Sequence, residues 1–151
     1  MKKLTTMLTA FIMLVSATAF SAEKDIVSEK IKTAFEKTFI NASDVKWKKL
    51  HEFYLADFRI NEQNASAAFN ENGELISAAR NITMDQVPLA VTLNLQNRFS
   101  GYTLANVLTE LTTDGITSYF IKAQNAKRIL TIKASAFGDI SVEKKTKKKQ
   151  L

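Results

Sequence analysis

Residues that could carry out catalysis are scarce in this sequence. The chain has a single histidine, His51, and no cysteine, so it lacks thiol nucleophiles and thiolate metal ligands. A zinc site typically needs three or four ligands, and a calcium loop needs closely spaced acids, whereas Asp114 and Asp139 each stand alone beside a glycine. There is also no phosphate-binding glycine motif. The sequence therefore predicts a protein that is not an enzyme and holds no metal or other cofactor.

A binding surface is the alternative to an active site, and alternating segments indicate where it would lie. Residues 45–50, 53–60, 116–124 and 128–136 alternate apolar and polar side chains, which is typical of strands with one buried side. If the apolar members face the core, the others share the opposite side of the sheet. The candidate binding residues on that side are Lys46, Lys48, Asp57, Arg59, Phe120, Lys122 and Lys133.

This predicted side of the sheet is strongly cationic, with five basic residues and one acid among the candidates. Clustered positive charge would attract an acidic protein or peptide. The alternative is that the lysines only keep a polar sheet face in solution and discourage edge pairing. A register slip of one residue would move any strand's contribution to the other side. Trp47 also has two interpretations, as a core residue or as an interface anchor. The sequence does not indicate an oligomeric state.

The elements that must position these residues are predicted from periodicity and turn residues. Residues 24–38 carry apolar side chains at helical spacing behind a candidate N-cap, Asp25. A second helix is predicted from Asp85 to Phe99, with Pro88 in its first turn. The predicted strands are, in order, 45–50, 53–60, 65–69, 74–78, 103–112, 116–124, 128–136 and 140–143.

The order of elements repeats along the chain. Each predicted helix ends at a phenylalanine, Phe39 or Phe99, and each last hairpin turns at a glycine, Gly73 or Gly138. Such weak self-similarity indicates an internal duplication. We therefore expect one α+β domain over 23–143, made of two similar halves at about 24–80 and 81–143.

The beginning of the chain has the composition of a targeting segment. Lys2 and Lys3 precede an apolar block over 7–15, and small residues follow it, which is the order of a secretory signal peptide. The block is well short of the ~20 residues of a spanning helix. We expect residues 1–22 to be a cleaved signal peptide and the mature protein to be periplasmic or secreted; an uncleaved membrane anchor is the alternative.

The end of the chain carries most of the excess positive charge. Of the 21 basic residues, two lie in the leader and five in the segment 144–151, so residues 23–143 hold 14 basic residues against 15 acids and are almost neutral. A lysine run of this kind is normally solvated and unfolded, and we expect residues 144–151 to be a disordered basic tail. Because no aromatic residue is interleaved for base stacking, the tail predicts no nucleic-acid partner.

Several spaced features resemble one protein family. They are the run 39–47 (FINASDVKW), an aromatic-rich strand with Tyr54 and Phe58, the segment 68–73 (AFNENG), Pro88 ahead of a helix, and the segment 99–102 (FSGY). Over residues 25–143 the chain resembles the PepSY-like family of β-lactamase-inhibitor-like proteins, typically exported by Bacteroidetes-type bacteria. The resemblance implies helices packed on one face of an antiparallel sheet, built from two related halves. It implies no particular activity.

These observations predict an exported, non-catalytic protein-binding or inhibitor-like module that uses the open face of its sheet. The alternative is a periplasmic carrier of a small apolar ligand held between the helices and the sheet. Neither predicted function requires stable insertion into a membrane.

Overall fold

The computed structural model describes residues 27–148, and these residues form two α-helices, one 3₁₀ helix and nine strands. In chain order the elements are α2 (Glu29–Thr38), β1 (Ser43–Leu50), β2 (Phe53–Ile60), β3 (Gln63–Phe69), β4 (Leu75–Thr83), η1 (Met84–Gln86), α3 (Leu89–Arg98), β5 (Thr103–Leu104), β6 (Val107–Thr113), β7 (Ile116–Gln124), β8 (Arg128–Ser135) and β9 (Ile140–Lys147). The predicted signal peptide, 1–22, lies outside the described residues. The α+β class expected from the sequence is confirmed.

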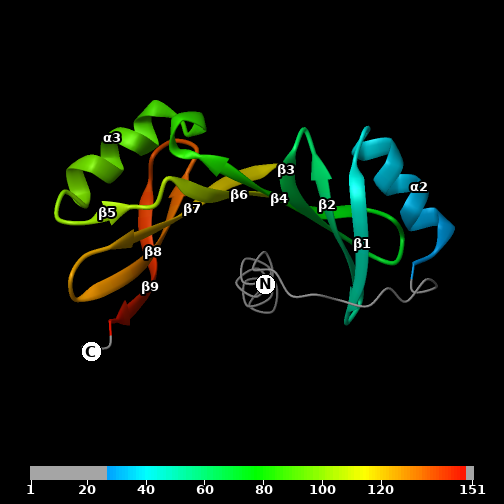
Figure 1. Cartoon of the computed structure of the whole chain (residues 1–151). Coiled ribbons are helices and arrows are strands. Elements are labelled where there is room, and N and C mark those ends of the chain that lie inside the picture. Colours follow the sequence, from blue (N-terminus) through cyan, green and yellow to red (C-terminus); the bar gives the residue numbers. More distant parts are fainter. Residues whose placement is uncertain (1–26, 149–151) are drawn as a thin grey trace.

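The nine described strands belong to one antiparallel sheet. Their order is β1-β2-β3-β4-β6-β7-β8-β9, and the short β5 pairs with β7. Pairing of β4 with β6 joins the strands that precede α3 to those that follow it. The sheet is therefore continuous from β1 at one edge to β9 at the other (Figure 1).

Helix α2 packs through an aromatic stripe onto the first three strands. Ile31 and Phe35 are four residues apart, so both project from the buried side of the helix. The ring centroid of Phe35 lies 5.0 Å from that of Phe58 and 5.3 Å from that of Trp47. Phe69 is fully buried in the same cluster. Because full burial of one such side chain contributes about 1.5–3 kcal/mol, this cluster is enough to fix the helix on the sheet.

Helix α3 packs onto the later strands in a similar way. Val91 and Leu95 are fully buried and belong to a cluster with Ile121 of β7 and Ile132 of β8. The helix ends where Phe99 leaves the helical conformation (φ −122°, ψ 34°), although its N–H still donates to the carbonyl of Leu95 at 2.9 Å. The two helices thus pack on separate apolar clusters.

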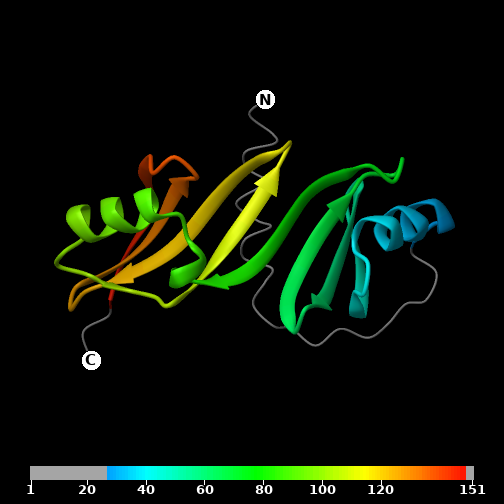
Figure 2. The ribbon, with the colours of Figure 1, turned by 90° about the horizontal axis from the view of Figure 1, so that it is seen from above.

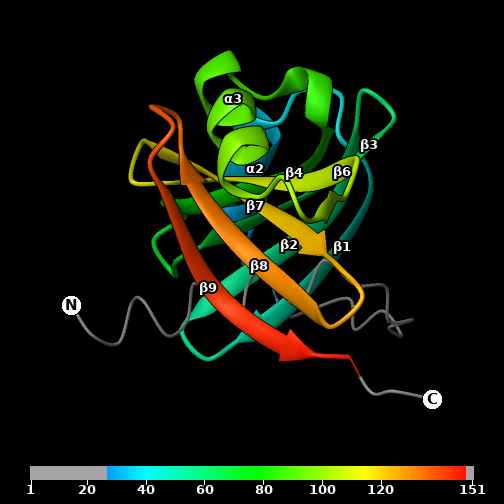
Figure 3. The same cartoon turned by 90° about the vertical axis from the view of Figure 1, so that its left-hand side faces the viewer.

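Both helices lie on the same side of the sheet (Figures 1 and 2). The register agrees, because Ala56 pairs with Ala67 and Ala67 with Ala78, and directly paired residues project to the same side. Ile82 lies four residues after Ala78 in β4, hence on that side, and belongs to the α3 cluster. On the other side, the outer strands descend below the middle ones, so the surface is concave (Figures 1 and 3). We call this second side the open face, since neither described helix lies on it.

The first helix begins later than its periodicity predicts. It starts at Glu29, after Ser28, whose backbone is extended (φ −66°, ψ 151°) and whose carbonyl accepts two N–H bonds of the first turn, at 3.0 and 3.1 Å. Val27 precedes the helix and is buried in the same apolar cluster as Phe35. The predicted range 24–38 was therefore wrong at its beginning, and the predicted cap Asp25 lies outside the described residues.

The second predicted helix is divided. Asp85 lies in the 3₁₀ helix Met84–Gln86, and α3 begins only at Leu89. A proline disfavours helical backbone in the residue before it, and Val87 is accordingly extended (φ −82°, ψ 141°). Pro88 therefore occupies the N-cap position of α3 and not its first turn.

The strand predicted over 103–112 is also divided, into β5 and β6. The N–H of Ala105 donates to the carbonyl of Lys122 in β7 at 2.8 Å, whereas the carbonyl of Asn106 accepts from the N–H of Met84 at 3.0 Å. The chain therefore bulges away from β7 at this point, pairs with β4 from Val107, and returns to β7 at Thr109. Strand β4 pairs with β6 from Ser77 to Thr83, so it is longer than predicted.

Strand β9 extends to Lys147, into the segment predicted to be a disordered tail. Lys144 pairs with Thr131 of β8, and the pairing continues to Lys147. Backbone hydrogen bonds form this part of the strand, and exposed lysines are a common feature of edge strands. The prediction was wrong for residues 144–147, while residues 149–151 lie outside the described part of the chain.

Candidate functional site

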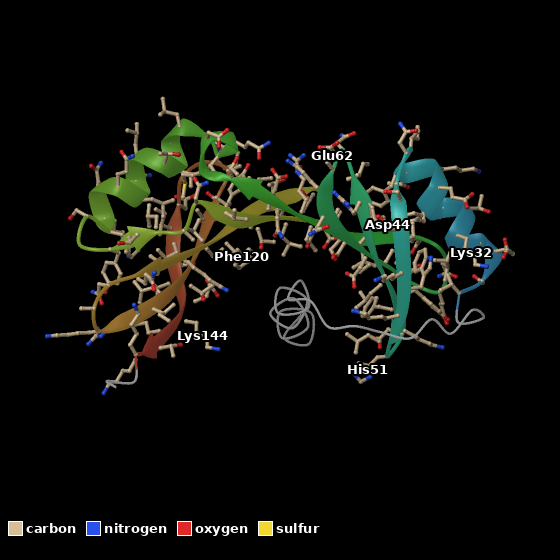
Figure 4. The ribbon with its side chains drawn as sticks, in the orientation of Figure 1. Lys32, Asp44, His51, Glu62, Phe120 and Lys144 are labelled. Carbon is tan, nitrogen blue, oxygen red and sulfur yellow. The ribbon has the colours of Figure 1, made fainter. Side chains whose placement is uncertain are left out.

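The residues considered for catalysis do not come together. Within residues 27–148 there is no group of three or more histidine, cysteine or acidic residues that could hold a metal ion. His51 is exposed at the tip of the β1–β2 hairpin, with φ 55° (Figure 4). No helix in this part of the chain is long and apolar enough to cross a membrane.

The centre of the open face is apolar. Its buried residues, which we call the open-face cluster, are Leu55, Ala68, Ala79, Leu111 and Phe120, drawn from β2, β3, β4, β6 and β7. Leu50 and Ile76 pack against them. Figure 4 shows Phe120 below the middle strands, on the side away from the helices. Sequence alternation places Phe120 on this face but predicts an outward side chain, whereas only 8% of it is exposed.

The sequence analysis did not predict the other residues of the open-face cluster, because it assumed that only one side of each strand is apolar. Leu55 lies between Tyr54 and Ala56, and Ala68 lies between Ala67 and Phe69. Consecutive apolar residues in a strand indicate burial on both sides of a sheet. That signal, present in β2 and β3, was the one available in the sequence.

Asp57 is held by two neighbours on the open face. The Lys48 ammonium lies 2.9 Å from one carboxylate oxygen of Asp57, and the Ser66 hydroxyl donates to the other at 2.7 Å. Lys46 pairs with Asp57 in the strand register and is exposed. Since Lys48 neutralises the one predicted acid, the charge remaining on this face is positive.

At the other end of the open-face cluster, two lysines accompany Phe120. Lys133 is its cross-strand partner, and the ammonium lies 5.9 Å from the centroid of the phenyl ring, a distance typical of a cation–π contact. Lys122 is exposed two residues further along β7. The structure thus brings Phe120, Lys122 and Lys133 together beside the apolar centre.

Arg59 and Trp47 lie apart from this arrangement. Arg59 is exposed near the end of β2, where its guanidinium donates to the carbonyl of Glu62 at 3.2 Å. Trp47 projects to the helix side, with its ring centroid 6.1 Å from that of Phe69. Of the two interpretations of Trp47, the geometry therefore supports the core residue, and the indole is not part of the open face.

On the side of the sheet that carries the helices, a polar site lies between the cluster beneath α2 and the cluster beneath α3. Arg80 and Glu110 form an ion pair there, beside a depression of about 280 Å³. Burial raises the pKa of the Tyr119 hydroxyl, and the Glu110 carboxylate raises it further, partly through a hydrogen bond. Tyr119 is therefore a neutral donor to Glu110 at physiological pH.

A third feature is a depression of about 350 Å³ between α2 and the edge strand β1. Its lining residues are Lys32, Phe35, Glu36, Phe39, Ile40, Asn41, Ala42, Val45 and Trp47. Ile40 is 70% exposed and Val45 is 37% exposed. The depression is therefore lined by aromatic rings together with the polar side chains of Lys32, Glu36 and Asn41, and two of its apolar residues, Ile40 and Val45, are exposed.

The arrangement of two helices on one curved antiparallel sheet is shared with solved structures from Bacteroides. A protein described as periplasmic from Bacteroides eggerthii has a TM-score of 0.68 and 19% identity, with 80% of this chain and 88% of that one covered. A BLIP-like protein from Bacteroides fragilis has a TM-score of 0.68 and 16% identity, with 91% and 94% covered. A DUF2874 family protein from Bacteroides uniformis has a TM-score of 0.68 and 19% identity, with 80% and 89% covered.

These similarities establish the fold, because identities of 16–19% do not carry function. No protein-family model matches the chain, and a search of curated proteins found no significant match. The chain therefore has a BLIP-like fold, and its function must be argued from its own surfaces.

Proposed function

We propose that this protein is an exported, non-catalytic module that binds an acidic protein or peptide through its open face. The observation that carries this proposal is the open-face cluster, an apolar centre with lysines at its margin. Protein interfaces commonly combine an apolar core with a polar rim. An inhibitor-like role is one form that such binding takes.

The charges around the cluster favour an acidic partner. Within the described residues, neither Lys122 nor Lys133 has a carboxylate partner. Lys133 instead lies over Phe120, so a carboxylate that approaches the apolar centre would meet its ammonium group. Opposite charges across an interface raise the association rate and select against wrong partners.

Export is proposed from the leader and from the fold. Residues 1–22 have the order of a signal peptide, and one structure with the same fold is described as a periplasmic protein. The β-lactamase-inhibitor-like name agrees with a BLIP-like protein among the similar structures. The narrower PepSY-like assignment rests on the sequence resemblance over residues 25–143.

We also propose that the chain contains two related halves, because corresponding contacts recur in each. The N–H of Phe39 donates to the carbonyl of Phe35 at 2.8 Å, and Phe99 ends α3 with the same bond. In the β3–β4 turn, a Cβ added at Gly73 would lie 3.3 Å from the carbonyl oxygen of Lys30 in α2. In the β8–β9 turn, a Cβ added at Gly138 would lie 3.2 Å and 2.9 Å from atoms of α3.

The carrier alternative is less well supported by the helix–sheet contacts. Val91 and Leu95 of α3 fill their side of the sheet and are fully buried. The depression beside α2 is open at the sheet edge, with Ile40 70% exposed at its rim. A small apolar ligand there would remain partly in water, so we propose the binding module.

Affinity capture from an envelope extract of the host tests this proposal. The bait is the mature domain, either unchanged or with Lys122→Glu and Lys133→Glu together. The matched control reverses two exposed lysines on the helix side, Lys30→Glu and Lys37→Glu. We expect the open-face variant to lose the captured protein and the control to retain it, and the purified partner should then bind more weakly at high salt. Equal capture by both variants would show that the open face is not the binding surface.

A further inference from the structure

We propose that the outer edge of β1 and the depression beside α2 form a second binding site, for an extended peptide that alternates apolar and acidic residues. This site lies at the end of the sheet next to α2, away from the Phe120 end of the open face (Figure 4). The two surfaces can therefore be tested separately.

The backbone of β1 can accept another strand. Within residues 27–148, β1 pairs only with β2 and is the first strand in the sheet order. In an antiparallel pair, alternate residues direct their N–H and C=O groups away from the partner strand. An extended peptide can use such groups to add a strand to the sheet.

The depression beside this edge offers a place for apolar side chains. Its volume of about 350 Å³ is near the lower end of the ~300–1,000 Å³ typical of ligand pockets. Phe35, Phe39 and Trp47 form its walls, while Ile40 and Val45 stand exposed at its rim. Burial of the rim residues by a peptide would remove apolar surface from water.

The two sides of β1 specify an alternating peptide. In the regular part of β1, from Lys46 to Leu50, successive side chains point to opposite sides of the sheet, so alternate peptide residues would lie on the side of Trp47, where Val45 borders the same depression. The residues between them would lie on the open-face side, beside Lys46 and Lys48. Lys48 already pairs with Asp57, whereas Lys46 has no carboxylate partner within the described residues. Acidic residues at those positions would complement Lys46.

The same lysines disfavour a second copy of this chain as the occupant. Two β1 edges paired with each other would bring lysines into close proximity, and like charges opposite each other destabilise a strand pair. Lysines on an edge strand are a known means of preventing self-association. An acidic strand avoids that repulsion, so the charge of β1 selects between partners.

A synthetic seven-residue peptide that alternates glutamate with valine or leucine is the direct probe. It is titrated into the ¹⁵N-labelled mature domain, and chemical shifts and amide exchange are followed by NMR. We expect the β1 amides to shift and to gain protection from exchange. A peptide of the same composition with its glutamates grouped together, and one with proline at two central positions, should bind at least about tenfold more weakly because they cannot both pair and alternate.

Two exposed residues provide a matched pair of variants. Ile40→Glu places a carboxylate at the rim of the depression and should weaken peptide binding about tenfold, because it removes apolar contact and repels the acidic peptide. Leu89→Glu on α3 is the control, since Leu89 is 71% exposed and Ile40 is 70% exposed. Thermal unfolding of both variants verifies that each remains folded.

Other outcomes would overturn the inference. Binding that Ile40→Glu leaves unchanged would place the peptide elsewhere. Binding lost in the Lys122→Glu, Lys133→Glu protein but retained in Ile40→Glu would assign the peptide to the open face, which would support the proposed function and refute the edge site. A shift of Trp47 fluorescence by dodecanoate, with none by any peptide, would make the depression a small-molecule site.

Discussion

The two faces of the sheet predict different costs for removing a phenyl ring. Phe69 is fully buried beneath α2, with aromatic rings on several sides; its centroid lies 6.2 Å from that of Phe35. Phe120 is 8% exposed on the open face, where no described helix covers it. The substitutions Phe69→Ala and Phe120→Ala therefore remove the same atoms from two environments.

The expected magnitudes follow from what replaces the ring. At Phe69 the cavity is enclosed between helix and sheet, so transfer and cavity costs add, and we expect a loss near the top of the range for such substitutions, about 4–5 kcal/mol. At Phe120 the space opens to water, so the transfer cost alone applies, about 2–3 kcal/mol. Lys133 also loses its cation–π contact, which contributes about 0.5–1 kcal/mol at an exposed site.

Urea unfolding monitored by circular dichroism measures both losses. With the lost cation–π contact included, the difference between the two losses is about 1 kcal/mol, which corresponds to about 4 °C in melting temperature for a domain of this size. Phe69→Leu is a milder substitute in case Phe69→Ala does not fold. Equal losses for the two alanine variants would refute the reasoning, because they would show that the open face is as fully enclosed as the helix side.

Three further predictions concern the turns, a buried tyrosine and the last strand. Gly138 and Gly115 both have positive φ, but of these two only Gly138 lies close to a helix. Gly138→Ala should therefore destabilise the fold by about 2–3 kcal/mol, and Gly115→Ala by about 1–2 kcal/mol. Urea unfolding measures both losses. The pKa of Tyr119 is raised in the folded state, which means that folding favours the protonated hydroxyl. The stability that this hydroxyl contributes is complete below the unfolded pKa of about 10 and is lost as pH rises through the folded pKa. In urea titrations at several pH values above 9, Tyr119→Phe should therefore lose less stability than the unchanged protein. Deletion of residues 144–151 should lower the free energy of unfolding by about 1–2 kcal/mol, because strand pairing with β8 is lost. Deletion of 149–151 alone is the control. Equal stability of the two truncated proteins would show that the end of β9 contributes nothing.

Local patterns predicted the strands best where alternation and turn residues agreed. The predicted bounds of β2 and β7 coincide with the observed ones, because polar turn residues flank both strands. The predictions were wrong where a distant partner decides the structure. Lys144–Lys147 form a strand because β8 offers them backbone partners, and no local pattern of lysines reveals that.

The candidate surface was predictable in its charge but not in its centre. The positions of Lys46, Lys48 and Asp57 on one side follow from the alternation in β1 and β2. The burial of Phe120 depends on residues from four other strands, and only the sheet order brings those together. Lys133 was predicted on this face as a charge, whereas its contact with the Phe120 ring requires the cross-strand register.

The ladder between β4 and β6 has a consequence for how such proteins diversify. The cluster beneath α2 and the cluster beneath α3 share no residue, so the two packed bodies are connected through this run of paired backbone and through the open-face cluster on the other side of the sheet. Substitutions at ladder positions outside the two helix clusters, such as Ala79 and Leu111, would change the angle at which the bodies meet without repacking either helix cluster. The width of the hollow beneath them would change accordingly, which allows one scaffold to be refitted to differently shaped targets.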